Sequence, residues 1–437
     1  MPTLLSWGRY PNTPQTPTAC HWPDDLSRGL DQQRHQGRTT LAYGAGLSYG
    51  DSGLAASDHV LHTVGLDRFV AADWTTGRVT AQAGVTFEQI LAVAIPRGWY
   101  LPVSPGTKYV TLGGAIANDV HGKNHHRRGT LGRHVVRLGL RRSDRAPLVC
   151  SSTEEVALFQ ATIGGLGLTG LIEWAEIQLT PIRSSRIRSV TQRFDTLDEF
   201  FVLSATLDLQ HEFCVSWVDC AASGNSLGRG VYMAGDFADD GPLEVAHPRR
   251  LTMPVTPPVS PVTQATVRAF NALYWRRAPR VPAIRTGSYE PFFYPLDSVL
   301  QWNRVYGPAG FQQYQCVIPE ACARDGVSAL LREIAASGLG SPLAVLKRCG
   351  DLASPGLLSF PMAGTTLALD FPHSERLTHD LFPRLDAVVR EAGGRLYPAK
   401  DAHMSARDFQ ATYPAWTTVE ALRDPQLLSR FWQRVTR

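Results

Sequence analysis

A glycine-rich segment at residues 43–51, Tyr-Gly-Ala-Gly-Leu-Ser-Tyr-Gly-Asp, is the first place in the chain where the residue types suit ligand chemistry. Glycines let the backbone adopt positive φ and turn several N–H groups toward one point, which makes a concave site for a pyrophosphate. Taken alone, the segment is also typical of an ordinary glycine-rich turn. Its cofactor-binding candidates are Gly44, Gly46, Ser48, Tyr49 and Gly50.

A second segment, residues 105–125, combines small residues with polar ones. Small residues let a flat aromatic ligand approach the backbone, and polar side chains offer contacts around it. His121 and His125 have the spacing of helical metal ligands, but Gly122 lies between them and no glutamate or cysteine supports them, so no metal site is predicted. A buried polar turn is the alternative. The cofactor-binding candidates are Pro105, Gly106, Thr107, Gly113, Gly114, Ala117, Asn118, His121, Gly122 and Lys123.

A third segment, residues 164–170, formally satisfies the dinucleotide fingerprint with Gly165, Gly167 and Gly170. That fingerprint has meaning only between a preceding strand and a following helix. Here residues 152–162 look helical and residues 176–179 alternate like a strand, which is the reverse order. A Rossmann site is therefore rejected in favour of close packing against another planar cofactor, with Gly167, Gly170 and Ile172 as candidates.

The elements that must position these segments have recognisable start and stop signals. Thr86 with Gln89 predicts a capping box, and Pro96 with Gly98 predicts the end of that helix. Thr196 with Glu199 predicts a second helix start, and residues 381–391 predict a third helix before a short strand at 395–397. Residues 254–261 contain four prolines and are predicted to be a loop. Alternating strands and helices over residues 39–180 predict an α+β domain.

Composition narrows the class of protein. A chain of 437 residues with 43% hydrophobic and 19% charged residues is expected to be globular and to form two domains. No apolar run approaches the roughly 20 residues of a membrane helix, and the net charge of +4 is spread along the chain, so neither a membrane span nor nucleic-acid binding is predicted. Seven cysteines without a two-residue spacing are expected to be reduced. Residues 1–11 lack a secretory signal pattern, so the expected location is cytoplasmic.

The three glycine-rich segments together resemble the vanillyl-alcohol-oxidase (PCMH-type) class of FAD-binding domains. More narrowly, His-Gly-Lys-Asn-His-His at residues 121–126 resembles the decaprenylphosphoryl-ribose 2′-oxidase family. Further segments that resemble this family extend over nearly the whole chain, at residues 302–310, 313–315, 358–361, 370–372 and 394–401.

The resemblance implies a two-lobed α+β FAD-binding domain with an inserted substrate domain built on an antiparallel sheet with helices. The implied boundaries are residues 1–183 for the N-terminal part of the FAD domain, 184–394 for the substrate domain and 395–437 for a C-terminal return to the FAD domain. Covalent members of the class attach the flavin to a histidine in the first glycine-rich loop. Leu47 occupies that region and no histidine lies between residues 39 and 51, so a non-covalent FAD is expected.

The resemblance also implies roles for single residues. Tyr397 and Lys400 fall on family positions beside the flavin and the substrate, and Tyr49 falls on a position near the substrate. The catalytic candidates are Lys400, His121 and Tyr49. A lysine there can stabilise the negative charge that a flavin gains as hydride arrives. The implied substrate-binding residues are Gln315, Lys347, Trp217, Thr366, Ala368, Phe293 and Lys400. Three of these depart from the family, since a cysteine, an asparagine and a tyrosine of its pocket correspond to Ala368, Thr366 and Phe293.

The implied reaction oxidises a secondary alcohol of a sugar or sugar phosphate to a keto-sugar by hydride transfer to flavin N5. A short-chain ketoreductase acting on the product would complete an epimerisation. His121 is a candidate for the base and equally for a residue that orients the flavin. The alternatives are an alditol or aldonolactone oxidase that uses oxygen, and a flavin-binding protein without turnover.

Overall fold

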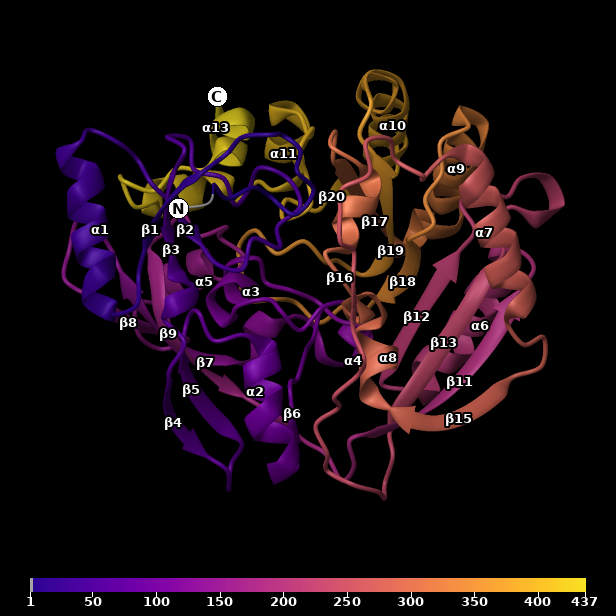
Figure 1. The fold of residues 1–437 in the computed structure, drawn as a ribbon, viewed down its shortest axis with the longest axis horizontal. Coiled ribbons are helices and arrows are strands. Elements are labelled where there is room, and N and C mark those ends of the chain that lie inside the picture. Colours follow the sequence, from indigo (N-terminus) through magenta and orange to yellow (C-terminus); the bar gives the residue numbers. More distant parts are fainter. Residues whose placement is uncertain (1–2) are drawn as a thin grey trace.

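The computed structural model of the chain describes residues 3–437, and Figure 1 shows it as two halves side by side. The left half contains the first 180 residues and the C-terminal helices, and the right half contains most of the rest. The predicted α+β class is confirmed. The prediction that residues 1–11 lack a secretory signal includes residues 1–2, which lie outside the described residues.

The left half is built on two sheets. A parallel sheet has the order β1 (Thr16–Ala19), β3 (His59–His62), β2 (Ala42–Tyr43). An antiparallel sheet has the order β4 (Phe69–Asp73), β5 (Arg78–Gln82), β9 (Leu171–Gln178), β7 (Val135–Arg141), β8 (Leu148–Ser151). β6 (Trp99–Tyr100) and β10 (Thr180–Pro181) form a separate short ladder. The helices are α1 (Pro23–His35), α2 (Phe87–Ala94), α3 (Leu112–Ala117), α4 (His125–Arg128) and α5 (Val156–Thr162).

Local signals predicted both ends of the α2 segment correctly, but they placed the start of α5 too early. The Thr86 hydroxyl accepts the Gln89 N–H at the start of α2, and Gly98 closes the following turn at φ +78°. α5 starts at Val156, later than the predicted residue 152. The Ser151 hydroxyl accepts the N–H groups of Thr153 and Glu154 and holds them in a turn, which competes with the helix.

The right half is built on one sheet of eight strands in which every pairing is antiparallel. The order is β15 (Ala283–Ser288), β11 (Arg186–Phe194), β13 (Gly230–Phe237), β12 (Phe213–Val218), β18 (Ala344–Cys349), β19 (Gly364–Pro372), β17 (Phe311–Pro319), β20 (Arg395–Leu396). The helices are α6 (Leu197–Gln210), α7 (Gln264–Arg277), α8 (Tyr289–Phe293), α9 (Ala323–Ser337) and α10 (Phe382–Glu391). β14 (Leu251–Thr252) and β16 (Val299–Leu300) pair outside the sheet, on either side of the predicted proline loop.

The packing of α9 shows how a helix covers this sheet. Val327, Leu330, Leu331 and Ile334 recur at helical spacing, and all four are fully buried. They belong to the same hydrophobic cluster as residues of β17 and β19, such as Ile318 and Leu367. Each such side chain contributes about 1.5–3 kcal/mol through burial.

The chain returns to the left half through its last three helices, α11 (Ala406–Thr412), α12 (Trp416–Leu422) and α13 (Arg430–Thr436), drawn in yellow in Figure 1. The N–H of Thr40 donates to the carbonyl of Gln426, and the N–H of Asp424 donates to the carbonyl of Leu168. The capped start of α6 at Thr196, the helix α10 and the strand β20 confirm three predicted elements. The residue boundaries of the domains stay predictions.

Two further features agree with the sequence. All seven cysteines are free thiols. None of the helices within residues 3–437 combines the length and the hydrophobicity that crossing a bilayer would require.

Candidate active site

A cavity of about 430 Å³ brings together all three glycine-rich segments with residues from β17, β18 and β19. The predicted cofactor residues on its wall are Gly44, Gly46, Ser48, Tyr49, Pro105, Gly106, Thr107, Gly113, Gly114, Ala117, Asn118, His121, Gly122, Lys123, Gly167, Gly170, Ile172 and Tyr397. The predicted substrate residues on its wall are Gln315, Lys347, Thr366, Ala368, Phe293 and Lys400. All but two of the predicted site residues therefore lie on the wall of one continuous cavity.

Two predicted site residues lie elsewhere, Gly50 and Trp217. Gly50 is buried against the C-terminal return, where a Cβ would stand 1.7 Å from the carbonyl oxygen of Asp401. Trp217 donates its indole N–H to the carbonyl of Pro342 and packs edge-on against Tyr274. Gly50 thus serves chain packing and Trp217 serves the attachment of α7, and neither is on the cavity wall.

The glycine wall leaves room that protein atoms do not fill. A Cβ at Gly106 would have no heavy atom of the surrounding protein within 4 Å, and Gly106 lies on the cavity wall without a positive φ. At Gly167, φ is +75° and only the side chain of Leu41 comes as near as 4.0 Å. Bare backbone of this kind suits close contact with a flat ring.

The first glycine-rich loop is held between the two ends of the chain. The N–H groups of Trp7 and Gly8 donate to the carbonyls of Ser48 and Tyr49, and the N–H of Tyr49 donates to the carbonyl of Ala399 at 3.2 Å. The N–H of Asp51 donates to Asp401 on the same side. This pairing brings Tyr49 beside Lys400 although they are far apart in sequence.

We expect Gly50→Ala to lower the free energy of unfolding by about 1–3 kcal/mol, because the new methyl group would push residues 399–401 away from this loop. Denaturant titration of the purified protein measures the loss. Gly53→Ala is the matched control in the same loop, since its Cβ would meet only the Ser48 side chain, at 3.4 Å. Equal stabilities of the two variants would show that Gly50 is not a packing residue.

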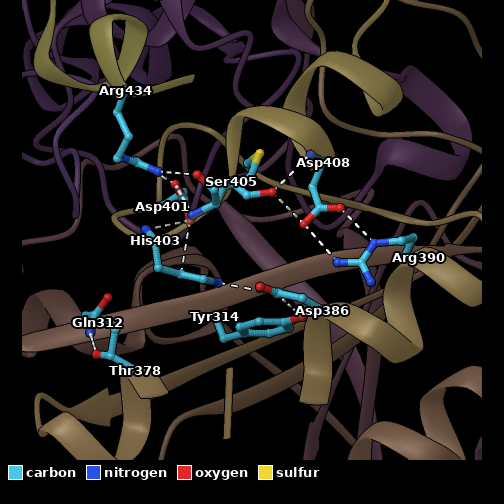
Figure 2. A network of polar contacts seen from close by, with 11 residues as sticks. Gln312, Tyr314, Thr378, Asp386, Arg390, Asp401, His403, Ser405, Asp408 and Arg434 are labelled. Carbon is cyan, nitrogen blue, oxygen red and sulfur yellow. Dashed lines mark hydrogen bonds and ion pairs between the residues drawn. The ribbon is translucent and has the colours of Figure 1, made fainter. Parts of the chain in front are cut away.

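A buried polar network fixes the backbone that carries Lys400 (Figure 2). Arg434 of α13 donates to Asp51 and to Asp401, each at 2.8 Å. His403 lies 3.3 Å from Asp386, which also accepts the Tyr314 hydroxyl at 3.0 Å. Burial lowers the pKa of His403, but the carboxylates of Asp401 and Asp386 have a larger effect, so the pKa of His403 is raised. The network therefore ties α13, β17 and α10 to residues 400–403.

Lys400 and Tyr49 form the polar end of the cavity. The ammonium of Lys400 stands 3.6 Å from the centre of the Tyr49 ring, a cation–π contact. Burial lowers the pKa of Lys400 to about 8, while attraction to Asp370 opposes this. Burial and Asp370 both raise the pKa of Tyr49 well above 10, so its phenol stays protonated. Burial also raises the pKa of Asp370, whose carboxylate accepts the Gln313 amide at 2.5 Å.

Lysines are rare in this chain, and their placement is informative. Only four occur among 437 residues, and Lys123, Lys347 and Lys400 all line the cavity. Lys347 donates to the carbonyl of Gly122 at 2.7 Å, and Lys123 donates to that of Phe293 at 3.1 Å. Burial and the charge of Lys347 lower the pKa of Lys123 to about 8. Burial also lowers the pKa of Lys347, although nearby Cys349 opposes this shift. Buried cations without a carboxylate partner predict an anionic ligand.

His121 lies between the glycine wall and the substrate residues. Its Nε2 accepts the Gln315 amide at 3.2 Å, which places the ring proton on Nδ1. Nδ1 is buried and has no hydrogen-bond partner within residues 3–437. Burial and the nearby Lys347 lower the pKa of His121 well below 6.5, so the ring is neutral. A ligand in the cavity can supply the missing partner.

Two residues at this site had no role assigned from the sequence, Gln313 and Asp370. Both lie inside segments that resemble the family, and that resemblance is the signal in the sequence that points to them. The scarcity of lysine was a further signal in the sequence, since three of only four lysines line the cavity.

The comparisons with known proteins agree with this geometry. A model of an FAD binding domain matches residues 18–144. The decaprenylphosphoryl-β-D-ribose oxidase of Mycolicibacterium smegmatis is 33% identical and covers 97% of this chain and 94% of its own length. An uncharacterised protein of Streptomyces coelicolor is 32% identical over 78% of this chain and 95% of its own. The L-gulonolactone oxidase of Mus musculus is 28% identical over 38% of each chain.

The residues present fit FAD. The three glycine-rich segments offer bare backbone to a flat ring and a pyrophosphate, Gly106 borders open space, and the unpartnered Nδ1 of His121 and the buried lysines suit a polar, anionic ligand. The chain therefore belongs to the decaprenylphosphoryl-β-D-ribose oxidase family, and it is an FAD-dependent oxidoreductase that acts on the CH–OH group of sugars.

Proposed function

We propose that this enzyme oxidises a secondary hydroxyl of a polyprenyl-phosphoryl pentose to the keto-sugar, with FAD held without a covalent bond. The relative in M. smegmatis is named for decaprenylphosphoryl-β-D-ribose. The observation that carries the proposal is the meeting of Lys400, Tyr49, Gln315 and Lys347 in the cavity that the glycine wall borders. Leu47, in place of a histidine in the first loop, supports a non-covalent flavin.

FAD, when bound, accepts the hydride that leaves the substrate carbon. Tyr49 keeps its proton and can donate a hydrogen bond to a substrate oxygen. Lys400 places a positive charge beside it, where charge develops during the reaction. His121 is held by Gln315 and is too weakly basic to take a proton at neutral pH, which favours an orienting role for it over that of the base.

The substrate phosphate is proposed to lie near Lys347 or Lys123. Within residues 3–437 these ammonium groups bind only backbone carbonyls, so each retains donors for a phosphate oxygen. Around them Thr366, Ala368 and Phe293 replace larger or more polar family residues, and the Thr366 hydroxyl accepts from Gln315 at 3.5 Å. The sugar contacts of this chain are therefore expected to differ in detail from those of the relative.

We expect Asp370→Asn to move the alkaline limb of the flavin-reduction rate to lower pH. The Lys400 cation is present below its pKa and is lost as the pH rises through that pKa, near 8. Removing the Asp370 carboxylate removes the attraction that raises this pKa, so the cation is lost at lower pH. Anaerobic stopped-flow reduction across pH 6–10 measures the limb. An unmoved limb would exclude this coupling.

The proposed substrate is tested by anaerobic reduction of the flavin with three pentose forms: free, 5-phosphorylated, and polyprenyl-phosphoryl. Bleaching that is fastest with the lipid-linked form supports the proposal. Bleaching by free sugars alone would overturn the phosphate assignment.

We further propose that the keto-sugar is reduced by a short-chain ketoreductase, which would complete an epimerisation. Adding such a reductase with its nicotinamide cofactor to the oxidised product should yield the epimeric alcohol. Recovery of only the starting sugar would argue against this step.

A second candidate is an aldonolactone oxidase that reoxidises with oxygen, because L-gulonolactone oxidases match 36–38% of this chain. Hydrogen peroxide release on a panel of polyols and lactones distinguishes the two candidates.

A further inference from the structure

Residues 245–289 form a stretch of the chain in which every charged side chain is an arginine. They contain seven arginines and no lysine, aspartate or glutamate. All seven arginines are exposed. Arg250 alone among them has an ion-pair partner in the described part of the chain, Glu88 at 2.7 Å. The other six guanidinium groups are therefore open to a negatively charged surface.

The same stretch exposes large apolar side chains. Eight of the 15 large hydrophobic side chains exposed in residues 3–437 lie in it. The most exposed include Leu251, Val259, Val281 and Ile284, which are 62–78% exposed. Exposed apolar side chains in this number are typical of a contact with a protein partner or with a membrane.

The helix α7 shows how both properties share one surface. Val267 and Asn271 of this helix are buried, while Phe270, Leu273 and Tyr274 are 39–54% exposed. Phe270 and Tyr274 stack at 6.0 Å, and Arg276 and Arg277 follow in the last turn. Figure 1 shows α7 and the edge strand β15, which carries Ile284 and Arg285, at the outer right of the molecule.

This surface adjoins the active-site cavity at two places. Tyr274 packs on Trp217, which pairs in the sheet with Val345, and Val345 lies on the cavity wall. Leu251 pairs with Val299, and Val299 also lies on the cavity wall. The stretch therefore extends from the border of the cavity out to the edge of the sheet.

We propose that residues 245–289 form a docking surface for an anionic lipid bilayer. Arginines bind lipid phosphates, and aromatic and aliphatic side chains between them enter the interfacial layer. A second copy of the chain would bring the same positive charges together, which disfavours self-association through this face. A nucleic acid would satisfy the arginines but leave the apolar side chains in water. The surface goes beyond the proposed oxidation and stands without it.

The test is flotation of the FAD-loaded enzyme with vesicles of phosphatidylcholine alone and of equal parts phosphatidylcholine and phosphatidylglycerol. We expect binding to the anionic vesicles only, and weaker binding as salt increases. Arg276→Gln/Arg277→Gln/Arg280→Gln should lower the partition coefficient about 10- to 100-fold. Phe270→Ser/Leu273→Ser should lower it while the salt dependence remains. Arg28→Gln/Arg34→Gln/Arg38→Gln removes the same charge from α1 and its vicinity and should bind like the parent.

Several results would overturn the proposal. One is absence of vesicle binding by the parent enzyme, and another is an equal loss of vesicle binding in the α7 and α1 arginine variants. A third is complete displacement of the vesicles by RNA. The last is a dimer in solution that Phe270→Ser/Leu273→Ser dissociates without changing vesicle binding. Flavin absorbance of each variant, measured before flotation, verifies that folding is intact. Because binding is read without substrate, failure here leaves the proposed oxidation unaffected.

Discussion

Lys400→Met should slow the anaerobic reduction of the bound flavin by about 10²- to 10³-fold while FAD remains bound. Methionine keeps much of the length of the side chain and its contact with the Tyr49 ring, but it removes the charge that stands 3.6 Å from that ring. The loss is expected in the chemical step because a preorganised charge acts where negative charge develops. Stopped-flow reduction at saturating substrate, with the flavin absorbance as readout, measures it.

Lys400→Arg is the conservative control for this experiment. It keeps a positive charge over the Tyr49 ring and should recover part of the rate, and it should move the alkaline limb upward because a guanidinium stays protonated. Two outcomes would contradict the assigned role. One is a rate for Lys400→Met within threefold of the parent. The other is loss of FAD, which would assign Lys400 to cofactor binding instead.

Gly106→Val should weaken FAD binding by about 10- to 100-fold, equivalent to roughly 1–3 kcal/mol of overpacking. The backbone at Gly106 does not require positive φ, and the new side chain would meet no protein atom at its Cβ, so the apoprotein should fold normally. The cost arises only when the cofactor enters the same space. Fluorescence titration of the apoprotein with FAD gives the affinity, and thermal unfolding without FAD verifies that stability is unchanged.

Gly287→Val is the matched control, because Gly287 also has open space around its Cβ but lies on the edge strand β15 away from the cavity wall. It should bind FAD like the parent protein. If Gly106→Val came out of purification with a full complement of yellow cofactor, the cofactor would have to lie elsewhere in the cavity.

Much of the fold followed from the sequence because its signals are local. The hydroxyl of Thr86 and the amide of Gln89 are three residues apart, so a helix start there depends on nothing distant. The predicted start of α5 was a few residues early because of another local interaction. The Ser151 hydroxyl holds residues 153 and 154 in a turn, so the helix cannot include them. Glycine patterns likewise pointed to segments of the cavity wall, because glycine lets the backbone adopt positive φ and approach a ligand closely.

The sequence by itself determined the cofactor class, the starts of α2 and α6 and many residues of the cavity, since these follow from short motifs and from resemblance to a family. Only the tertiary structure decided which of them meet. Lys400 reaches Tyr49 because the 49–51 and 399–401 backbones pair and Arg434 joins Asp51 to Asp401. Gly50 and Trp217 are packing residues and do not line the cavity, because segments distant in sequence occupy the space beside them. Such contacts depend on burial and on charges brought together by the whole chain, and no local pattern encodes them.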